Sequence, residues 1–188
     1  LFSDIKSFTY MTETLGTGII NLLNMHYERA ITKVRNHYGI VGSIIGDALL
    51  AVFGTLPEEA DENKSIAAVR TAYEIQDVAS SLREEMTKRR EEIIRIKGAL
   101  TEEEEKIYKA VLIEVGVGID GGEVFYGNIG SSKRMTNTVI GDNVNSSSRL
   151  EGLTRIYKVP VICSAYIRDE IEKESDEFLG EDFAKFAG

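Results

Sequence analysis

Two aspartates are the residues of this chain best placed to do chemistry. Asp4 lies near the end of the apolar run "LFSDI", and Asp47 lies in "SIIGDALL" between two further apolar runs. A Gly-Asp pair flanked by apolar residues predicts a β-hairpin with Asp47 at its tip. In a β-α-β-β order the first strand lies beside that hairpin, so the two carboxylates are expected at one edge of the sheet. Two carboxylates that close repel each other unless a divalent cation binds between them.

That pair predicts a particular chemistry. Two Mg²⁺ ions held about 3.5–4 Å apart by carboxylates drive in-line displacement at phosphorus. The stretch "IKSFT" after Asp4 opens a helix, whose first N–H groups suit a polyphosphate at the same edge. The alternative for Asp47 is a turn aspartate that bonds its own backbone.

The core Ile-Gly-Asp recurs at Asp142, in "TVIGDNVN", before a stretch with helical spacing. There the aspartate is expected to cap the helix, so the two copies serve different elements and do not form a repeat. Asn145 and Arg149 are four residues apart and share one face of this helix. An Asn can hold a sugar oxygen and an Arg a charged phosphate, and the alternative is a solvated polar face.

The elements that must position these residues read β-α-β-β-α-β, with further βαβ-like elements. This order predicts an α+β fold with a ferredoxin-like core, an antiparallel-rich sheet and helices packed on one face of it. One continuous helix is expected from the stretch 7–39, a second over 57–90 and a third over about 143–154. The segment 85–106 is dense in both signs of charge and predicts a helical extension, either simply solvated or a contact arm for a regulator.

The composition of the chain excludes several classes of function and structure. A net charge of −9 argues against a nucleic-acid partner, and it suits a phosphate ligand only if metal ions lie between. No apolar run reaches the roughly 18 residues of a membrane span. The single cysteine, Cys163, excludes a disulfide within the chain, and its apolar neighbours predict a core thiol. The chain opens in mid-strand without Met, which predicts a fragment of a longer protein.

Four separated motifs resemble the class III nucleotide cyclases, the catalytic domain of adenylyl and guanylyl cyclases, most closely the bacterial adenylate cyclases. They are "LFSDIKSFT", "HYGIVGSIIGDALLAVFG", "GVGIDGGEVFYGNIGSSKR" and "TNTVIGDNVNSSSRLE". They match in order from residue 1 to about 170, within one domain over 1–188. The resemblance implies the nucleotide cyclase fold and conversion of ATP to 3′,5′-cyclic AMP and pyrophosphate. It also implies two Mg²⁺ or Mn²⁺ ions per site and a homodimer whose active sites are shared.

The resemblance also implies a role for each matching residue. Asp4 and Asp47 would bind the metal ions, with the Ile5 carbonyl as a further ligand. Asn145 would orient the ribose, and Arg149 would stabilise charge on the α-phosphate, both reaching the site from the partner protomer. The phosphates would bind at the turn that follows Asp4, which comprises Lys6, Ser7, Phe8 and Thr9.

The chain departs from the family pattern in two places. At the base-reading positions it has Ser43 and Thr138, where adenylyl enzymes usually have Lys with Asp or Thr and guanylyl enzymes have Glu at the first position. Thr138 and the missing Glu favour ATP, and a guanylyl or dual-specificity cyclase is the alternative. The phosphate-contacting lysine expected near the end is replaced in "KFAG" by Ala187, with Lys185 a weak substitute.

A non-catalytic nucleotide-binding module is the remaining alternative. The domain is expected in the cytoplasm, in a parent chain with regulatory or membrane domains.

Overall fold

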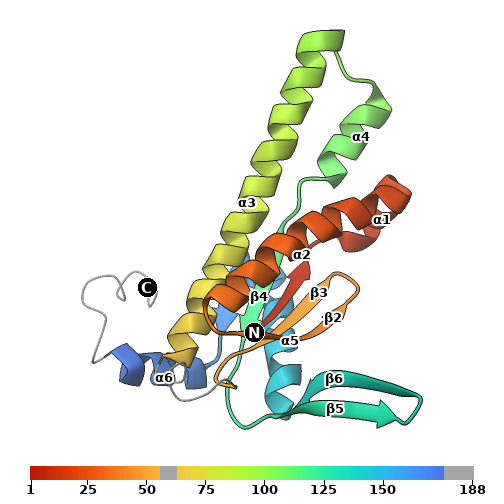
Figure 1. Ribbon diagram of the computed structural model, residues 1–188. Coiled ribbons are helices and arrows are strands. Elements are labelled where there is room, and N and C mark those ends of the chain that lie inside the picture. Colours follow the sequence, from red (N-terminus) through yellow and green to blue (C-terminus); the bar gives the residue numbers. More distant parts are fainter. Residues whose placement is uncertain (56–62, 176–188) are drawn as a thin grey trace.

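A mixed five-stranded sheet forms the centre of the computed structural model, which describes residues 1–55 and 63–175 (Figure 1). Across the sheet the strands run β2 (Ile40–Ile45), β3 (Ala48–Val52), β1 (Phe2–Ile5), β4 (Val115–Ile119) and β7 (Val161–Cys163). Every neighbouring pair is antiparallel except β4 and β7. The antiparallel-rich α+β prediction is therefore confirmed.

Cys163 is exposed, because β7 is an edge strand, so the prediction of a core thiol was wrong.

Helices cover both faces of this sheet, and the expectation of one covered face was wrong. On one face, α2 (Ile19–Asn36) and α3 (Lys64–Lys97) bury a core that includes Ile75, Leu82 and Val117. On the other face, α5 (Asp142–Tyr157) lies against the glycines of β4. Successive strand residues point to opposite faces, so the alternation of Val and Gly in "VGVGI" gives each face its own packing partner.

The first helical stretch is broken rather than continuous. It forms α1 (Phe8–Leu15), a 3₁₀ turn η1 (Gly16–Gly18) and then α2. Gly16 has a φ of 52°, a left-handed backbone conformation that ends α1. Asp142 likewise differs from its prediction: it is the first residue of α5, and the cap position is Gly141, with no side-chain cap. The negative charge of Asp142 still interacts favourably with the positive, N-terminal end of the helix dipole.

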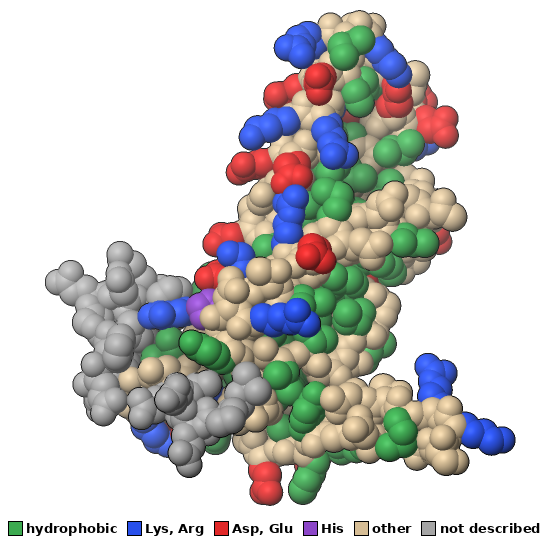
Figure 2. Space-filling model, in the orientation of Figure 1, with side chains coloured by type: hydrophobic (Ala, Val, Ile, Leu, Met, Phe, Trp, Pro, Cys, Tyr) green, Lys and Arg blue, Asp and Glu red, His purple; other side chains and the backbone are tan. Residues whose placement is uncertain are grey.

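The charged segment 85–106 forms the distal part of a helical arm. The second half of α3 continues beyond the core, and α4 (Glu102–Ala110) folds back beside it (Figure 1). Thr101 and Glu104 close a capping box at the start of α4. Both signs of charge alternate along this arm (Figure 2), and ion pairs such as Lys97–Glu104 at 2.7 Å link the two helices. Among the residues described, no helix combines the length and apolar character needed to cross a membrane.

A separate two-stranded sheet, β5 (Phe125–Ser131) with β6 (Arg134–Ile140), projects from the body of the molecule (Figure 1). The sequence analysis did not predict this separation from the main sheet. Val139 of β6 anchors the hairpin by packing over Gly42 of β2. The hairpin exposes large apolar side chains, including Phe125 at 71% and Met135 at 56%. After β7 comes α6 (Ala165–Ser175), which follows Ser164, whose hydroxyl accepts a hydrogen bond from the Ile167 N–H.

Candidate active site

The structure brings Asp4 and Asp47 together at one edge of the sheet. Strand β1 pairs with β3 through Phe2 opposite Leu50 and Ser3 opposite Leu49, and β1 ends one residue after Asp4. Gly46 and Asp47 form the two-residue turn between β2 and β3, with a φ of 62° at Gly46. This left-handed conformation suits glycine and sets Asp47 at the hairpin tip. The two carboxylates therefore converge although 43 positions separate them in sequence.

Their proximity is visible in the electrostatics. Partial burial, the charge of Asp4 and a hydrogen bond between the two carboxyl groups raise the pKa of Asp47 to about 6. The backbone N–H groups of Asp47 and Ile5 act in the opposite direction, because they stabilise the carboxylate. Two acids that resist simultaneous ionisation form a place where a cation would be favourable.

The donor set fits a hard divalent cation completed by substrate. The described residues contain no cluster of three or more His, Cys, Asp or Glu side chains that could hold a metal ion by itself. Mg²⁺ is commonly bound by only one or two carboxylates, together with water and substrate phosphates. Asp4 and Asp47 supply two carboxylates, and Ile5 lies next to Asp4 in the same strand. The arrangement thus suits an ion that arrives with a polyphosphate.

The turn after β1 leads directly into α1. Ser7 adopts a left-handed conformation with a φ of 60°, and its side chain does not cap the helix. The first N–H groups of α1, from Phe8 and Thr9, have no partners within the helix and suit an anionic ligand. The Lys6 N–H already donates to the Glu114 carbonyl over 2.8 Å, so Lys6 can offer only its side chain.

A polar cavity of about 700 Å³ opens beside this turn. Four cationic side chains line it: those of Lys6, Arg83, Arg155 and Lys158. Glu114 is the one acidic residue among its described lining residues. In a chain with a net charge of −9, such a concentration of positive charge suits the phosphates of a ligand.

The sequence analysis missed a network around Asp4. Arg155 donates to Asp4 Oδ2 over 2.7 Å and to Glu151 Oε2 over 3.1 Å. Glu151 is buried against Gly116, and burial raises its pKa. The spacing of Glu151 and Arg155 by four helical residues was a signal for the second contact. No signal in the sequence pointed to the first, which joins residues 151 positions apart.

Asn145 and Arg149 are exposed on α5. Within the described chain, no hydrogen bond or ion pair links either side chain to Asp4 or Asp47. Arg149 precedes Arg155 by six residues, or about 9 Å along the helix, and points to a different side of it. The same helix thus places Arg155 on Asp4 and leaves Arg149 exposed to solvent.

Ser43 and Thr138 flank the contact between β2 and β6. Ser43 is half-buried in β2, opposite Leu50, and Thr138 is half-buried in β6, opposite Gly127. Their neighbours Gly42 and Val139 pack on each other. The two predicted base-reading residues therefore lie on neighbouring strands of one protomer.

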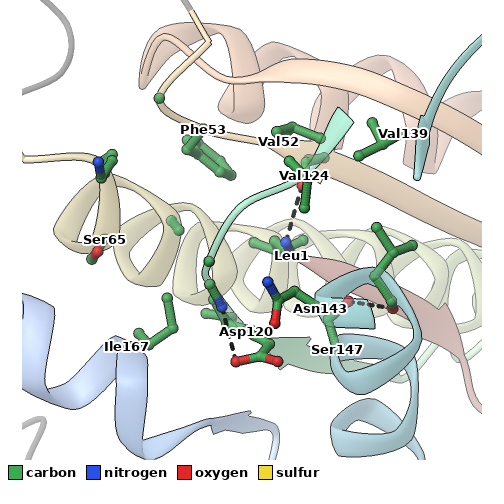
Figure 3. A pocket seen from close by; sticks show the side chains of 18 of the residues that line it. Leu1, Val52, Phe53, Ser65, Asp120, Val124, Val139, Asn143, Ser147 and Ile167 are labelled. Atoms are coloured by element: carbon green, nitrogen blue, oxygen red, sulfur yellow. Dashed lines mark hydrogen bonds between the residues drawn. The ribbon is translucent and has the colours of Figure 1, made fainter. Parts of the chain in front are cut away.

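Figure 3 shows a second cavity, of about 330 Å³, and neither Asp4 nor Asp47 is among the described residues that line it. The side chains that line it include Phe53, Val124, Asn143 and Ile167, and most of its surface is apolar (Figure 3). None of the predicted site residues lines it. The candidate active site is thus at the sheet edge and not at this cavity. Lys185 and Ala187, at the predicted position of the terminal phosphate-contacting lysine, lie outside the described residues.

Comparison with known proteins gives one consistent result. The family model for the adenylate and guanylate cyclase catalytic domain matches residues 1–178. A terminal-differentiation-specific adenylate cyclase of Dictyostelium discoideum is 29% identical, over 95% of this chain and 7% of that protein. An adenylate cyclase of Anabaena cylindrica is 30% identical, over 84% of this chain and 27% of that protein.

A solved structure has the same fold. It is that of a bacterial light-regulated adenylyl cyclase, with 28% identity and a TM-score of 0.71 over 90% of this chain and 43% of the solved one. This chain therefore spans less than half the length of each of these three proteins.

Proposed function

Because this chain belongs to the adenylate and guanylate cyclase catalytic domain family, we propose that it converts a nucleoside triphosphate, foremost ATP, into its 3′,5′-cyclic nucleotide and pyrophosphate. The observation that carries the proposal is the convergence of Asp4 and Asp47, where burial, together with the charge of Asp4 and a hydrogen bond to it, raises the pKa of Asp47 to about 6. A carboxylate pair of this kind is costly unless a cation joins it. The reaction needs such a cation beside a polyphosphate.

In the reaction the ribose 3′-oxygen attacks the α-phosphorus, the bond from that phosphorus to the oxygen bridging the α- and β-phosphates breaks, pyrophosphate leaves, and the proton of the 3′-hydroxyl passes to solvent. Two Mg²⁺ or Mn²⁺ ions, held by Asp4, Asp47 and the Ile5 carbonyl, would acidify that hydroxyl and neutralise the phosphates. The N–H groups at the start of α1 and the Lys6 and Lys158 side chains would hold the leaving pyrophosphate. Catalysis then rests mainly on positioning and on charge stabilisation.

We propose a homodimer with two shared sites. Asn145 and Arg149 are exposed on α5, and among the described residues neither forms a hydrogen bond or ion pair with the aspartates of its own chain. In a partner's site, Asn145 would orient the ribose and Arg149 would stabilise charge on the α-phosphate. The apolar side chains exposed on β5 and β6, Phe125 and Met135 among them, support an interface on that side of the protomer.

Base preference would depend on Ser43 and Thr138. A serine hydroxyl both donates and accepts hydrogen bonds, so it discriminates adenine from guanine less than a lysine does. We propose ATP as the substrate, with GTP as the alternative, because Ser43 discriminates the two bases less than a lysine would. We also propose that the domain faces the cytoplasm, where both nucleotides are found, within a longer signalling protein.

The test is turnover of ATP and of GTP by the purified domain with Mg²⁺ and with Mn²⁺. Protein should be at high concentration, so that a weak dimer forms. We expect cyclic AMP with a higher kcat/KM than cyclic GTP. The reverse ratio would establish the guanylyl alternative, and no cyclic nucleotide from either substrate would refute the enzymatic proposal.

A further inference from the structure

Arg155 contacts the Asp4 carboxylate, which is also the group proposed to bind the metal ion. One arm of its guanidinium group contacts Asp4 Oδ2 at 2.7 Å, and the other contacts Glu151 Oε2 at 3.1 Å. The Asp4 side chain is only 24% exposed, so few water molecules can share that oxygen. A divalent ion that binds Asp4 through Oδ2 therefore competes with Arg155 for that oxygen.

Glu151 holds the arginine in place. Its side chain is 4% exposed, and its second oxygen, Oε1, is buried without a hydrogen-bond partner among the described residues. Leaving a buried carboxylate without Arg155 would be costly, because its charge would then lack a counter-ion. Arg155 thus has a fixed attachment to Glu151 and a second, exchangeable one to Asp4.

We propose that Arg155 is an internal counter-ion that competes with the divalent cation for Asp4 and thereby sets the metal affinity of the domain. The inference rests on the proposed ion site at Asp4 and Asp47. When ionised, the three carboxylates of Asp4, Asp47 and Glu151 with one guanidinium leave two negative charges, which one divalent ion balances. Arg155 can therefore stay on Glu151 while it releases Asp4.

After release from Asp4, the guanidinium group of Arg155 can contact a ligand in the polar cavity. Arg155 is 39% exposed and lines the polar cavity together with Lys6 and Lys158. A polyphosphate in that cavity would accept hydrogen bonds from the guanidinium group as the ion takes Asp4. Metal and nucleotide would then strengthen each other's binding, because both favour the state in which the Arg155–Asp4 ion pair is broken.

The experiment measures Mn²⁺ binding without nucleotide, by electron paramagnetic resonance, so that turnover is not needed. For Arg155→Gln we expect the Mn²⁺ dissociation constant to fall about three- to ten-fold, as removal of a partly exposed ion pair and a nearby positive charge predicts. Arg155→Lys should lie between Arg155→Gln and the unaltered chain, because it keeps the charge but loses the two-armed geometry.

Lys158→Gln is the matched control. It removes one positive charge from the same cavity, but Lys158 makes no ion pair with Asp4 among the described residues, so we expect a change below about two-fold. An Arg155→Gln affinity equal to or weaker than that of the unaltered chain would overturn the inference, as would an equal gain in Lys158→Gln. Thermal unfolding of each variant checks that it is folded, and Arg155→Lys decides the question if Arg155→Gln does not fold.

Asp4→Asn separates this inference from the proposed function. If Asp4→Asn abolishes Mn²⁺ binding while Arg155→Gln leaves it unchanged, the ion site stands and the counter-ion inference fails. If neither the unaltered chain nor Arg155→Gln binds Mn²⁺, both fail. A gain that persists in the double variant Asp4→Asn, Arg155→Gln would also overturn the inference, because it would not act through Asp4.

Discussion

The Tyr27 hydroxyl donates a hydrogen bond to the backbone carbonyl of Gly46 over 2.8 Å, which ties the middle of α2 to the tip of the β2–β3 hairpin. Gly46 immediately precedes Asp47, so the contact fixes the turn that carries the second aspartate. Burial and the charges of Asp47 and Asp4 raise the pKa of Tyr27 above its usual range. The hydroxyl therefore stays protonated and remains a donor at neutral pH.

Tyr27→Phe should loosen the proposed ion site while leaving the fold intact. It removes one hydrogen bond and no apolar contact, so we expect a loss of about 1 kcal/mol in the free energy of unfolding. The aspartates would be less precisely placed, and kcat/KM should fall about three- to ten-fold with a higher Mn²⁺ requirement. Tyr166→Phe, on α6 and away from the hairpin, is the control. Unchanged metal dependence in Tyr27→Phe would contradict the positioning role.

Asp47→Asn should stabilise the metal-free chain at high pH and abolish turnover. The folded pKa of about 6 lies above the unfolded value of 3.8, so the folded state holds the proton more tightly. Stability from this group is therefore present below about pH 4 and lost as the pH rises through about 6. Chemical denaturation without divalent ions should show a gain for Asp47→Asn at pH 8 that shrinks at pH 4.5.

Added Mn²⁺ should reverse this ranking at pH 8. It should stabilise the unaltered chain through Asp4 and Asp47 but have little effect on Asp47→Asn. Asp77→Asn, an exposed carboxylate on α3, controls for the loss of one negative charge. Equal stabilisation of all three proteins by Mn²⁺ would argue against an ion site at Asp47.

Mixing two inactive variants should restore activity if sites are shared between protomers. Asp47→Asn lacks an ion ligand, and Arg149→Ala lacks the proposed phosphate contact, which should lower the rate by about 10²–10³. In a mixed dimer one of the two sites has neither substitution. Random exchange should therefore recover about a quarter of the wild-type sites, measured as cyclic nucleotide formed after co-incubation. No recovery, although mixed dimers form, would exclude the shared site.

His26 should make the fold sensitive to acid. Its side chain is 1% exposed in the core, Nδ1 has no partner in the described structure, and burial lowers its pKa to about 4. Below pH 6.5 the unfolded chain takes up a proton that the folded chain refuses, so stability falls as the pH drops. The loss from this group between pH 7.5 and 5 should be about 2 kcal/mol.

Denaturant unfolding of His26→Phe tests this assignment. The variant should show a smaller drop in stability over the same pH interval, whatever its absolute stability. The difference between the two slopes is the quantity of interest, because other groups titrate equally in both proteins. Identical slopes would show that His26 does not titrate as its burial predicts.

Gly118→Ala should disrupt the packing of α5 on β4. A Cβ atom at Gly118 would lie 2.0 Å from the Ser147 carbonyl oxygen and 2.3 Å from the Glu151 nitrogen, both backbone atoms that cannot move aside. We expect a cost of about 3 kcal/mol or more in the free energy of unfolding. Gly127→Ala in β5, where no atom lies within 4 Å, should change stability by less than about 1 kcal/mol. Similar stabilities of the two variants would contradict the close packing.

The sequence by itself identified the two aspartates and the elements that carry them. Strand periodicity and the Gly-Asp turn are local signals, because backbone geometry within a few residues produces them. The β2–β3 hairpin and the order of the core elements followed from such signals. The four family motifs then supplied the fold and candidate roles for residues such as Asn145 and Arg149.

Only the tertiary structure decided which residues meet across the chain. It placed α5 on the second face of the sheet, set β5 and β6 apart as a hairpin, and brought Arg155 onto Asp4. It also showed Tyr27 holding the hairpin tip. These contacts depend on strand order and on how closely a helix can approach a glycine-bearing strand. Both are settled by packing the whole chain, so no short stretch of sequence contains them.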